Sequence, residues 1–379
     1  MKVLHILFEL KFSGAEILYV DAAPLFHDRG CELTVMSTSL NAGEYAGHFR
    51  QAGYKVVHRP YPRGWNMWKR IRYYREFIHF LKKSHFDVIH IHVHAYMWAF
   101  SLCAWLARIR SVYTFHNVFP SHSYSYLYHV CQRWSAGKIF GCRFQSISDS
   151  VYDHELTYYR NKTEKIYNWY GADRFYPAQE EEKQRIRKEM NIPADALVLI
   201  SIGGCSEVKR HSDIIKALPY IIKKYPSAVY LHLGKGHTEE VEKGLAVELG
   251  VEAHIRFYGN QTDVRKFLIA SDLYLMTSKF EGISITTIEA MACGIPAILY
   301  DVPGLRDFNK TGENSCLIPV DYKILAEKVI ELYAKPEVAA GISANAKELV
   351  NNVYHIEKNV PEIFNLYIHM HIFLYLNTL

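Results

Sequence analysis

The sequence predicts an α/β protein built from two Rossmann-like domains, each with its own parallel β-sheet. Short apolar runs alternate with helical patterns along two separate stretches of the chain, which is typical of βαβ units. The length of 379 residues is large for one hydrophobic core and suits two domains. Residues 273–300 also form a strand–loop–helix–strand pattern, in which the loop and helix start lie where parallel sheets bind anions.

The composition is that of a soluble globular protein, with 49% apolar and 22% charged residues. Residues 1–7 predict a short strand and are not followed by the small-residue cleavage site of a signal peptide. No apolar run approaches the roughly 20 residues needed to span a bilayer. The seven cysteines form no Cys-x-x-Cys pair, which favours reduced, buried thiols of a cytoplasmic protein over a disulfide or zinc framework.

The formal net charge of +5 is unevenly distributed, because residues 59–83 carry many basic side chains against one acid, Glu76. The basic residues are Arg59, Arg63, Lys69, Arg70, Arg72, Arg75, Lys82 and Lys83, interleaved with Trp65, Trp68, Tyr73, Tyr74, Phe77 and Phe80. Such a segment suits an anionic lipid surface or a pyrophosphate-linked acceptor. The alternative is a solvated helix whose aromatic stripe faces the core. No motif supports binding to nucleic acid.

The amino-terminal half contains the first series of predicted strands, at residues 3–8, 33–36, 88–91, 112–115 and 144–147. Gly14 lies in the first βα connection, where it opens a helix without a side chain that would obstruct a ligand. His116 follows the strand at 112–115. A histidine at a strand end is commonly a hydrogen-bonded structural residue, and the alternative is a side chain in a binding cleft.

Three histidines alternate near the third predicted strand, at His90, His92 and His94. If all three lay in one strand they would share one face, which raises the possibility of a metal site. Imidazoles on a single strand diverge too little to surround a tetrahedral ion, and no nearby acid or thiolate completes the set. We therefore expect no metal site.

The carboxyl-terminal half contains the second series, with strands predicted at residues 197–202, 229–233, 255–258, 273–276 and 297–300. Residues 180–189, which precede it, are highly charged and predict a solvated helix. The first βα turn of this half contains Gly203, Gly204, Lys209 and Arg210.

Two carboxylates lie in the unit that follows the strand at 273–276. Glu281 is in the loop and Glu289 is about two turns into a helix that Ser284 can cap. Gly282 permits a close approach of the backbone to a ligand. At the helix start we expect unpaired donors in the amides of Ile283, Ser284 and Ile285. A diphosphate could rest on these amides while the two carboxylates hold sugar hydroxyls.

These two glutamates, followed by Ala-Met-Ala-Cys-Gly-Ile-Pro at residues 290–296, resemble the signature of the family-four retaining glycosyltransferases. The resemblance runs from roughly residue 1 to 335 and includes an inter-domain passage at 166–177. It implies the GT-B fold, in which two Rossmann-like domains face a cleft. The expected boundaries are an acceptor domain at 1–168, a nucleotide-sugar domain at 169–353, and a last helix at 354–379 that packs back on the first domain.

The resemblance also implies roles for individual residues. The expected catalytic residues are Glu281, which would hold the donor sugar, and His116, which would contact it from the other domain. The expected donor-binding residues are Gly14, Gly203, Lys209, Arg210, Asn260, Gly282, Ile283, Ser284, Ile285 and Glu289. Ser13 replaces the first glycine of the family's glycine loop, and Gly204 replaces its usual arginine, so that Arg210 either supplies the second cation or faces water.

The implied reaction moves a sugar from a nucleoside diphosphate sugar, with a UDP-sugar as the expected donor, to a hydroxyl of a glycan or polyprenyl-diphosphate-linked acceptor. We expect a metal-independent hexosyltransferase without cofactors, acting in capsule or surface polysaccharide synthesis. The expected location is cytoplasmic, with peripheral contact to the inner face of the membrane through residues 59–83. Two alternatives remain: a nucleotide-sugar epimerase of the same fold, and a non-catalytic subunit that binds nucleotide sugars.

Overall fold

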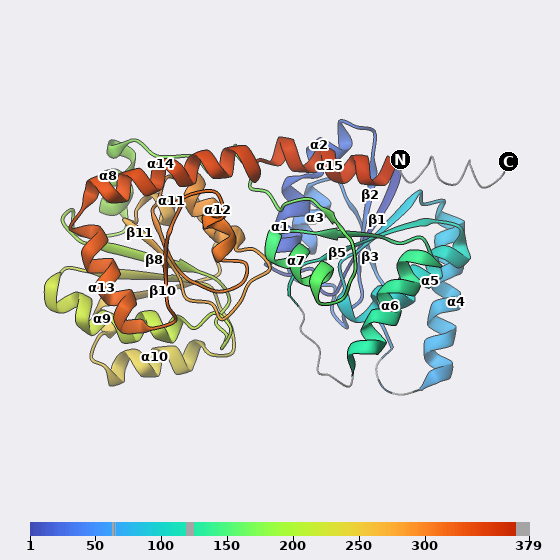
Figure 1. The fold of residues 1–379 in the computed structure, drawn as a ribbon, viewed down its shortest axis with the longest axis horizontal. Coiled ribbons are helices and arrows are strands. Elements are labelled where there is room, and N and C mark those ends of the chain that lie inside the picture. The colour runs from blue at the N-terminus through green and yellow to red at the C-terminus, as the bar shows by residue number, and fades with distance from the viewer. Residues whose placement is uncertain (63, 65, 119–124, 369–379) are drawn as a thin grey trace. The chain divides into compact units, whose positions relative to one another are not determined.

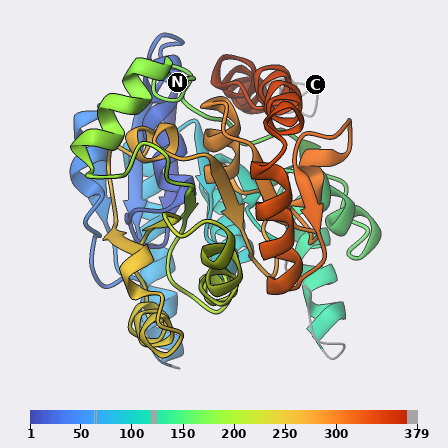
Figure 2. The ribbon, with the colours of Figure 1, turned by 90° about the vertical axis from the view of Figure 1, so that its left-hand side faces the viewer.

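The computed structural model describes residues 1–62, 64, 66–118 and 125–368. By its internal contacts the chain divides into two compact units. The first comprises Met1–Trp169 together with the segment that begins at Ile356, and the second comprises Tyr170–His355. Each unit contains one parallel sheet flanked by helices (Figures 1 and 2), which confirms the prediction of two Rossmann-like domains.

The first unit contains a seven-stranded sheet with the order β3-β2-β1-β4-β5-β6-β7, in which every neighbouring pair is parallel. Its strands are β1 (Lys2–Leu7), β2 (Glu32–Ser37), β3 (Lys55–His58), β4 (Val88–Ile91), β5 (Arg110–Phe115), β6 (Arg143–Ser146) and β7 (Glu164–Lys165). The prediction missed β3 and β7, the two edge strands. Both are short and partly exposed, so they lack a continuous apolar run.

Helices cover both faces of this sheet. The helices are α1 (Gly14–Asp21), α2 (Ala23–His27), α3 (Ala46–Gln51), α4 (Met67–Ser84), α5 (Met97–Ala107), α6 (Tyr126–Lys138), α7 (Asp149–Thr157) and α15 (Ile356–Ile368). α4 packs on α5 and α5 on α6, whereas α15 packs on α2 (Figure 1). On α15, the hydroxyl of Tyr367 lies 2.5 Å from His90 Nδ1. The last described helix is therefore tied to the central strand β4.

The second unit contains a six-stranded parallel sheet with the order β10-β9-β8-β11-β12-β13. Its strands are β8 (Val198–Ile202), β9 (Val229–Leu233), β10 (Ile255–Gly259), β11 (Leu273–Met276), β12 (Ala297–Tyr300) and β13 (Cys316–Ile318). Its helices are α8 (Glu180–Glu189), α9 (His211–Lys224), α10 (Glu239–Glu248), α11 (Arg265–Ile269), α12 (Ile285–Ala292), α13 (Tyr322–Tyr333) and α14 (Pro336–Val353). α9 packs against α10 and α13 on one face, and α12 packs against α14 on the other. The strand order reverses between β8 and β11, and open α/β sheets bind ligands at such a reversal.

Helix α8 is only partly the solvated helix that its charge predicts. Ile186 and Arg187 are buried, and the Arg187 guanidinium donates to Asp272 Oδ1 at 2.7 Å and to the carbonyl of Ala270 at 2.9 Å. The prediction of a solvated helix was wrong for the side of α8 that carries Ile186 and Arg187. The charge content of a segment does not reveal that one of its charges pairs with a distant residue, here Asp272.

Helix α4 contains most of the basic segment at residues 59–83. One side of the helix is buried against the first unit and the other side is exposed. Tyr73, Phe77 and Leu81 are buried, as expected for an aromatic stripe that faces the core. Trp68 is 79% exposed and Ile71 is 43% exposed on the outer side. The buried stripe agrees with the core-facing alternative, and contact of the outer face with a lipid or an acceptor stays a prediction. Arg63 and Trp65 lie outside the described residues.

The cysteines carry no disulfide, and all except Cys131 and Cys316 are buried. Among the described residues, no helix combines the length and the apolar composition that crossing a bilayer would require.

Replacing Tyr367 by Phe should destabilise the first unit, because the buried His90 Nδ1 loses its hydrogen-bond partner. We expect a loss of about 1–3 kcal/mol in the free energy of unfolding, measured by urea denaturation. The control is Tyr220→Phe, at a tyrosine that is 47% exposed, which should change stability by less than about 0.5 kcal/mol. Equal stability of both variants would show that α15 does not stabilise the sheet through this bond.

Candidate functional site

The loop between β11 and α12 holds Glu281 by its backbone. The amide of Glu281 donates to the carbonyl of Pro303 at 3.0 Å. Gly304 has a φ of +81°, and a Cβ at this position would lie 2.3 Å from the Glu281 carbonyl oxygen. Only glycine permits this close passage, so the 303–304 turn fixes the loop that carries the carboxylate.

Ser284 caps α12 as predicted, because its Oγ accepts a hydrogen bond from the amide of Thr287 at 3.2 Å. Ile283 is buried, and neither its amide nor that of Ile285 donates to a described residue. Buried amides normally have a partner, and at a helix start this partner can be an anion. Glu289 is on the same helix and is only 6% exposed.

Lys209 and Glu281 form a partly buried ion pair, 2.6 Å from Nζ to Oε1. Their side chains are 23% and 14% exposed, and Ser278 Oγ donates to the same carboxylate oxygen at 2.6 Å. The Lys209 stem packs over Gly203, where a Cβ would lie 3.2 Å from Lys209 Cε. The structure therefore brings together Lys209, Glu281 and Gly203, residues that are up to 78 positions apart in the chain.

The loop that carries Lys209 is tied to the loop that carries Glu281 at two further points. Thr277 Oγ1 donates to the carbonyls of Lys209 and Arg210, each at 3.0 Å. The amide of Lys279 donates to the carbonyl of Val208 at 2.7 Å. These hydrogen bonds hold the two loops together, so the backbone positions the Lys209 ammonium next to the Glu281 carboxylate.

Arg210 is placed differently from Lys209. Its guanidinium donates to Asp213 Oδ2 through Nε at 2.9 Å and through Nη2 at 2.7 Å. Asp213 is buried and also accepts from the Tyr300 hydroxyl at 3.0 Å. The charge of Arg210 is therefore already paired, which does not favour a role as the second cation for a diphosphate.

Lys235 is a residue of this region that the sequence reasoning missed. It lies between Gly234 and Gly236, where Cβ atoms would come within 1.9 Å of the Gly203 carbonyl and 2.0 Å of the Cys205 carbonyl. Its exposed side chain runs over Gly259, next to the exposed Asn260, and it forms no ion pair with a described residue. The sequence feature that could have identified Lys235 is the Gly-Lys-Gly pattern directly after the predicted strand at 229–233.

Gly14 and His116 lie in the first unit. Gly14 begins α1, and Ser13 at its N-cap hydrogen-bonds the carboxylate of Glu16. His116 follows β5, and its Nε2 lies 2.9 Å from His92 Nδ1. Burial lowers the pKa of His116 to about 4, so its imidazole is neutral near pH 7.

Of the three alternating histidines only His94 leaves the shared face, because β4 ends at Ile91 and His94 begins a 3₁₀ turn (His94–Tyr96). The rings of His90 and His92 lie next to each other, with centroids 4.2 Å apart. His90 has both ring nitrogens occupied, by the Tyr367 hydroxyl at 2.5 Å and by Thr114 Oγ1 at 2.6 Å. His92 lies instead between His5 and His116, with nitrogen–nitrogen distances of 3.2 and 2.9 Å. These side chains form hydrogen-bonded structure and include no anionic metal ligand.

The fold is that of a class of protein, the glycosyltransferases of GT-B architecture. HepE from Anabaena, solved in complex with UDP and glucose, is similar with a TM-score of 0.81 at 18% identity, over 97% of this chain and 99% of that chain. WaaG, a glycosyltransferase involved in lipopolysaccharide biosynthesis, is similar with a TM-score of 0.74 at 16% identity, over 96% and 99% of the two chains. At these identities the similarity shows the fold.

The chain belongs to glycosyltransferase family 4. The model for that family matches residues 12–203, and the model for glycosyl transferases group 1 matches residues 182–349. The putative glycosyltransferase EpsD of Bacillus subtilis is 28% identical over 208 residues, about half (54%) of each chain. N-acetyl-alpha-D-glucosaminyl L-malate synthase of Bacillus anthracis is 25% identical over 300 residues, 76% of this chain and 75% of that one.

Proposed function

We propose that this glycosyltransferase is a retaining, metal-independent hexosyltransferase, which moves a sugar from a UDP-sugar to a hydroxyl of a lipid-linked glycan. The observation that carries the proposal is the Lys209–Glu281 pair beside the unpaired amides at the start of α12. A cation and helix-start amides are suited to a diphosphate, and an adjacent carboxylate is suited to a sugar that develops positive charge.

In this proposal the Lys209 ammonium and the amides at 283–285 stabilise the departing diphosphate. Glu281, held by Ser278 and by the Pro303 carbonyl, is positioned before the donor arrives, so little reorganisation is needed during transfer. Glu289 would hold the ribose hydroxyls, and the neutral His116 could hydrogen-bond the transferred sugar. Lys235 would supply the second cation, since Gly204 has no side chain and Arg210 is paired with Asp213.

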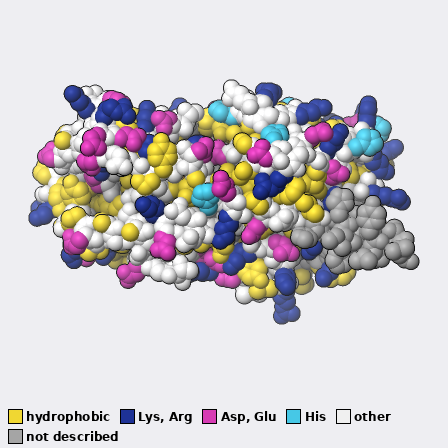
Figure 3. Space-filling view, turned by 90° about the horizontal axis from the view of Figure 1, so that it is seen from above, with side chains coloured by type: hydrophobic (Ala, Val, Ile, Leu, Met, Phe, Trp, Pro, Cys, Tyr) yellow, Lys and Arg dark blue, Asp and Glu magenta, His cyan; other side chains and the backbone are white. Residues whose placement is uncertain are grey.

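UDP is the proposed nucleotide because HepE, which shares the fold, was solved with UDP and glucose. Surface polysaccharide synthesis is the proposed pathway because WaaG acts in lipopolysaccharide biosynthesis. A lipid-linked acceptor would also explain the outer face of α4. There Trp68 and Ile71 lie beside Arg59, Arg72 and Arg75 around an open hollow of about 910 Å³. On the face of the second unit that carries α14, by contrast, acidic and basic side chains are interspersed (Figure 3).

Glu281→Gln should lower turnover by about 10²-fold or more, because it removes a preorganised charge from the transfer centre. The assay measures release of the nucleoside diphosphate from UDP-sugars in the presence of a lipid-linked glycan fraction, and NMR of the product reports its anomeric configuration. UDP at 100 times its Kd should still stabilise the variant by about 2.7 kcal/mol.

The control is Glu207→Gln, at a 67%-exposed glutamate whose ion-pair partner among the described residues is His237. Unchanged turnover in Glu281→Gln would contradict the assigned role of Glu281. A wild-type protein that binds UDP but releases no nucleoside diphosphate from any UDP-sugar would indicate a non-catalytic subunit. Conversion of the UDP-sugar to an isomer without acceptor would instead indicate an epimerase.

Lys235→Met should weaken UDP binding by about 10- to 100-fold, which corresponds to losing one charge-assisted hydrogen bond of about 1.5–3 kcal/mol. Isothermal titration of UDP measures the change. Lys347→Met is the matched control, since Lys347 is an exposed lysine on α14 without an ion pair to a described residue. Equal affinities in the two variants would assign the second cation to another residue.

Reversing Arg72 and Arg75 to Glu should release the protein from anionic vesicles, since each basic residue near the surface contributes about 1 kcal/mol. Co-sedimentation with phosphatidylglycerol vesicles should decrease more than tenfold, and phosphatidylcholine vesicles should bind neither protein. The control reverses Arg185 and Lys347, both exposed and outside α4. Undiminished binding of the α4 variant would exclude this helix as the membrane contact.

A further inference from the structure

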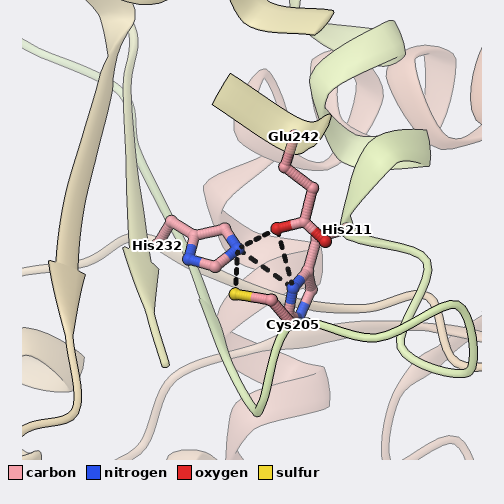
Figure 4. A group of neighbouring side chains, drawn as sticks. All are labelled: Cys205, His211, His232 and Glu242. Carbon is pink, nitrogen blue, oxygen red and sulfur yellow. Dashed lines mark hydrogen bonds and ion pairs between the residues drawn. The ribbon is translucent and has the colours of Figure 1, made fainter. Parts of the chain in front are cut away.

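Four buried side chains converge behind the loop that carries Lys209. They are Cys205 after β8, His211 at the start of α9, His232 in β9 and Glu242 in α10. Their exposed fractions are 1%, 1%, 0% and 3%, respectively. One potential ligand atom from each lies within 4.8 Å of all the others, and the side chains point toward one another (Figure 4).

The separations of the donor atoms suit a tetrahedral site. At zinc–ligand distances of about 2.0–2.3 Å, the ligand atoms of a tetrahedron lie roughly 3.3–3.8 Å apart. His232 Nε2 lies 3.0 Å from His211 Nδ1 and 3.1 Å from Glu242 Oε2. The His211 Nδ1–Glu242 Oε2 distance is 3.7 Å, and the Cys205 Sγ–His232 Nε2 distance is 3.9 Å. Four segments thus place their donor atoms near the corners of a tetrahedron that one ion could occupy at its centre.

The charge of the cluster also favours a cation. Glu242 is a buried carboxylate whose ion-pair contacts within the described residues are the two imidazoles, and no described Lys or Arg pairs with it. A buried anion without a cation is costly. A divalent ion bound by one carboxylate, one thiolate and two neutral imidazoles gives a net charge of zero. The second oxygen of Glu242 accepts from Thr238 Oγ1 at 2.7 Å, which is the outer hydrogen bond expected of a ligating carboxylate.

A hydrogen-bonded network without metal is the competing explanation. The inward nitrogens of His211 and His232 are 3.0 Å apart, so only one can carry a proton between them. The other ring then has its proton on the outer nitrogen. Both outer nitrogens, His211 Nε2 and His232 Nδ1, are buried and have no partner among the described residues. Metal binding places protons on both outer nitrogens. The metal state thus leaves two buried donors without a partner among the described residues, against one in the network. The proposal rests instead on the donor geometry and on a buried carboxylate that pairs with no described Lys or Arg.

We propose that Cys205, His211, His232 and Glu242 bind one zinc(II) ion in a closed structural site. Four protein ligands leave no open position for substrate, and mixed sulfur, nitrogen and carboxylate ligands suit zinc. The site is separate from the sugar-transfer chemistry, which is metal-independent in our proposed function. Cys205 and His211 flank Lys209 in sequence, so the ion would fasten both ends of the loop that carries it to β9 and α10.

The test uses the full-length chain without a histidine tag. We expect about one equivalent of zinc per chain by mass spectrometry of the metal, and a decrease in Tm on removal of the metal by a chelator that zinc reverses. Cobalt(II) substitution should give the visible spectrum of a tetrahedral site together with a thiolate-to-cobalt charge-transfer band. These readouts do not depend on activity, so they remain informative if the proposed function fails.

The ligand variants are Cys205→Ser and His232→Gln, which should lower zinc affinity at least 100-fold, with loss of the charge-transfer band in Cys205→Ser. The controls are Cys131→Ser, at an exposed cysteine, and His237→Gln, at a 66%-exposed histidine on the neighbouring loop. Both controls should bind zinc like the wild type. If the ligand variants do not fold, the wild-type cobalt spectrum decides.

Two results would overturn the proposal. One is a wild-type chain that binds no zinc or cobalt and keeps its Tm in the presence of zinc or chelator. The other is zinc binding that persists unchanged in Cys205→Ser and His232→Gln, which would place the ion at other residues.

Discussion

The ion pair between Lys209 and Glu281 is the interaction on which the candidate site of the second unit depends. It joins a loop that follows β8 to a loop that follows β11, two strands that are neighbours in the sheet. Either charge alone in this half-buried position would lack compensation. The hydrogen bonds from Thr277 and Lys279 hold the two loops in register, so the side chains meet without a ligand to order them.

Glycine makes this arrangement sterically possible. The three connections after β8, β9 and β10 approach one another through Gly203, Gly234, Gly236 and Gly259. The amide of Gly203 donates to the Leu233 carbonyl at 2.9 Å, and that of Gly234 donates to the Gly259 carbonyl at 2.8 Å. Side chains at Gly234 or Gly236 would collide with the backbone. Backbone groups of these three connections therefore pack closely together, and the side chains of Lys209 and Lys235 extend from this region.

Histidines are used differently in the two units. In the first unit, His5, His90, His92 and His116 are joined to one another and to hydroxyl groups, and burial lowers the pKa of each, so the interior carries neutral imidazoles. In the second unit, His211 and His232 face a carboxylate and a thiol. The second cluster adds a carboxylate and a thiol to its imidazoles, and the metal proposal is based on this cluster for that reason.

Much of the fold could be predicted because long apolar runs identify central strands of parallel sheets. The runs at 88–91, 229–233, 273–276 and 297–300 coincide with β4, β9, β11 and β12. The short edge strands β3, β7 and β13 could not be predicted in this way, since a strand with one neighbour needs fewer apolar residues. Ser284 could be predicted as the N-cap of α12 because capping depends on residues that are adjacent in the sequence.

The sequence by itself determined the two Rossmann-like domains, the family, and the candidacy of Lys209, Glu281 and Glu289, because strand periodicity and a contiguous motif are local properties. Tertiary structure alone decided that Arg210 is paired with Asp213, that Lys235 extends over Gly259, and that Cys205 lies close to His211, His232 and Glu242. These relations join segments brought together by the strand order. A one-dimensional sequence specifies which side chains are available, whereas the pairing of charges and ligands depends on distances that only the folded chain fixes.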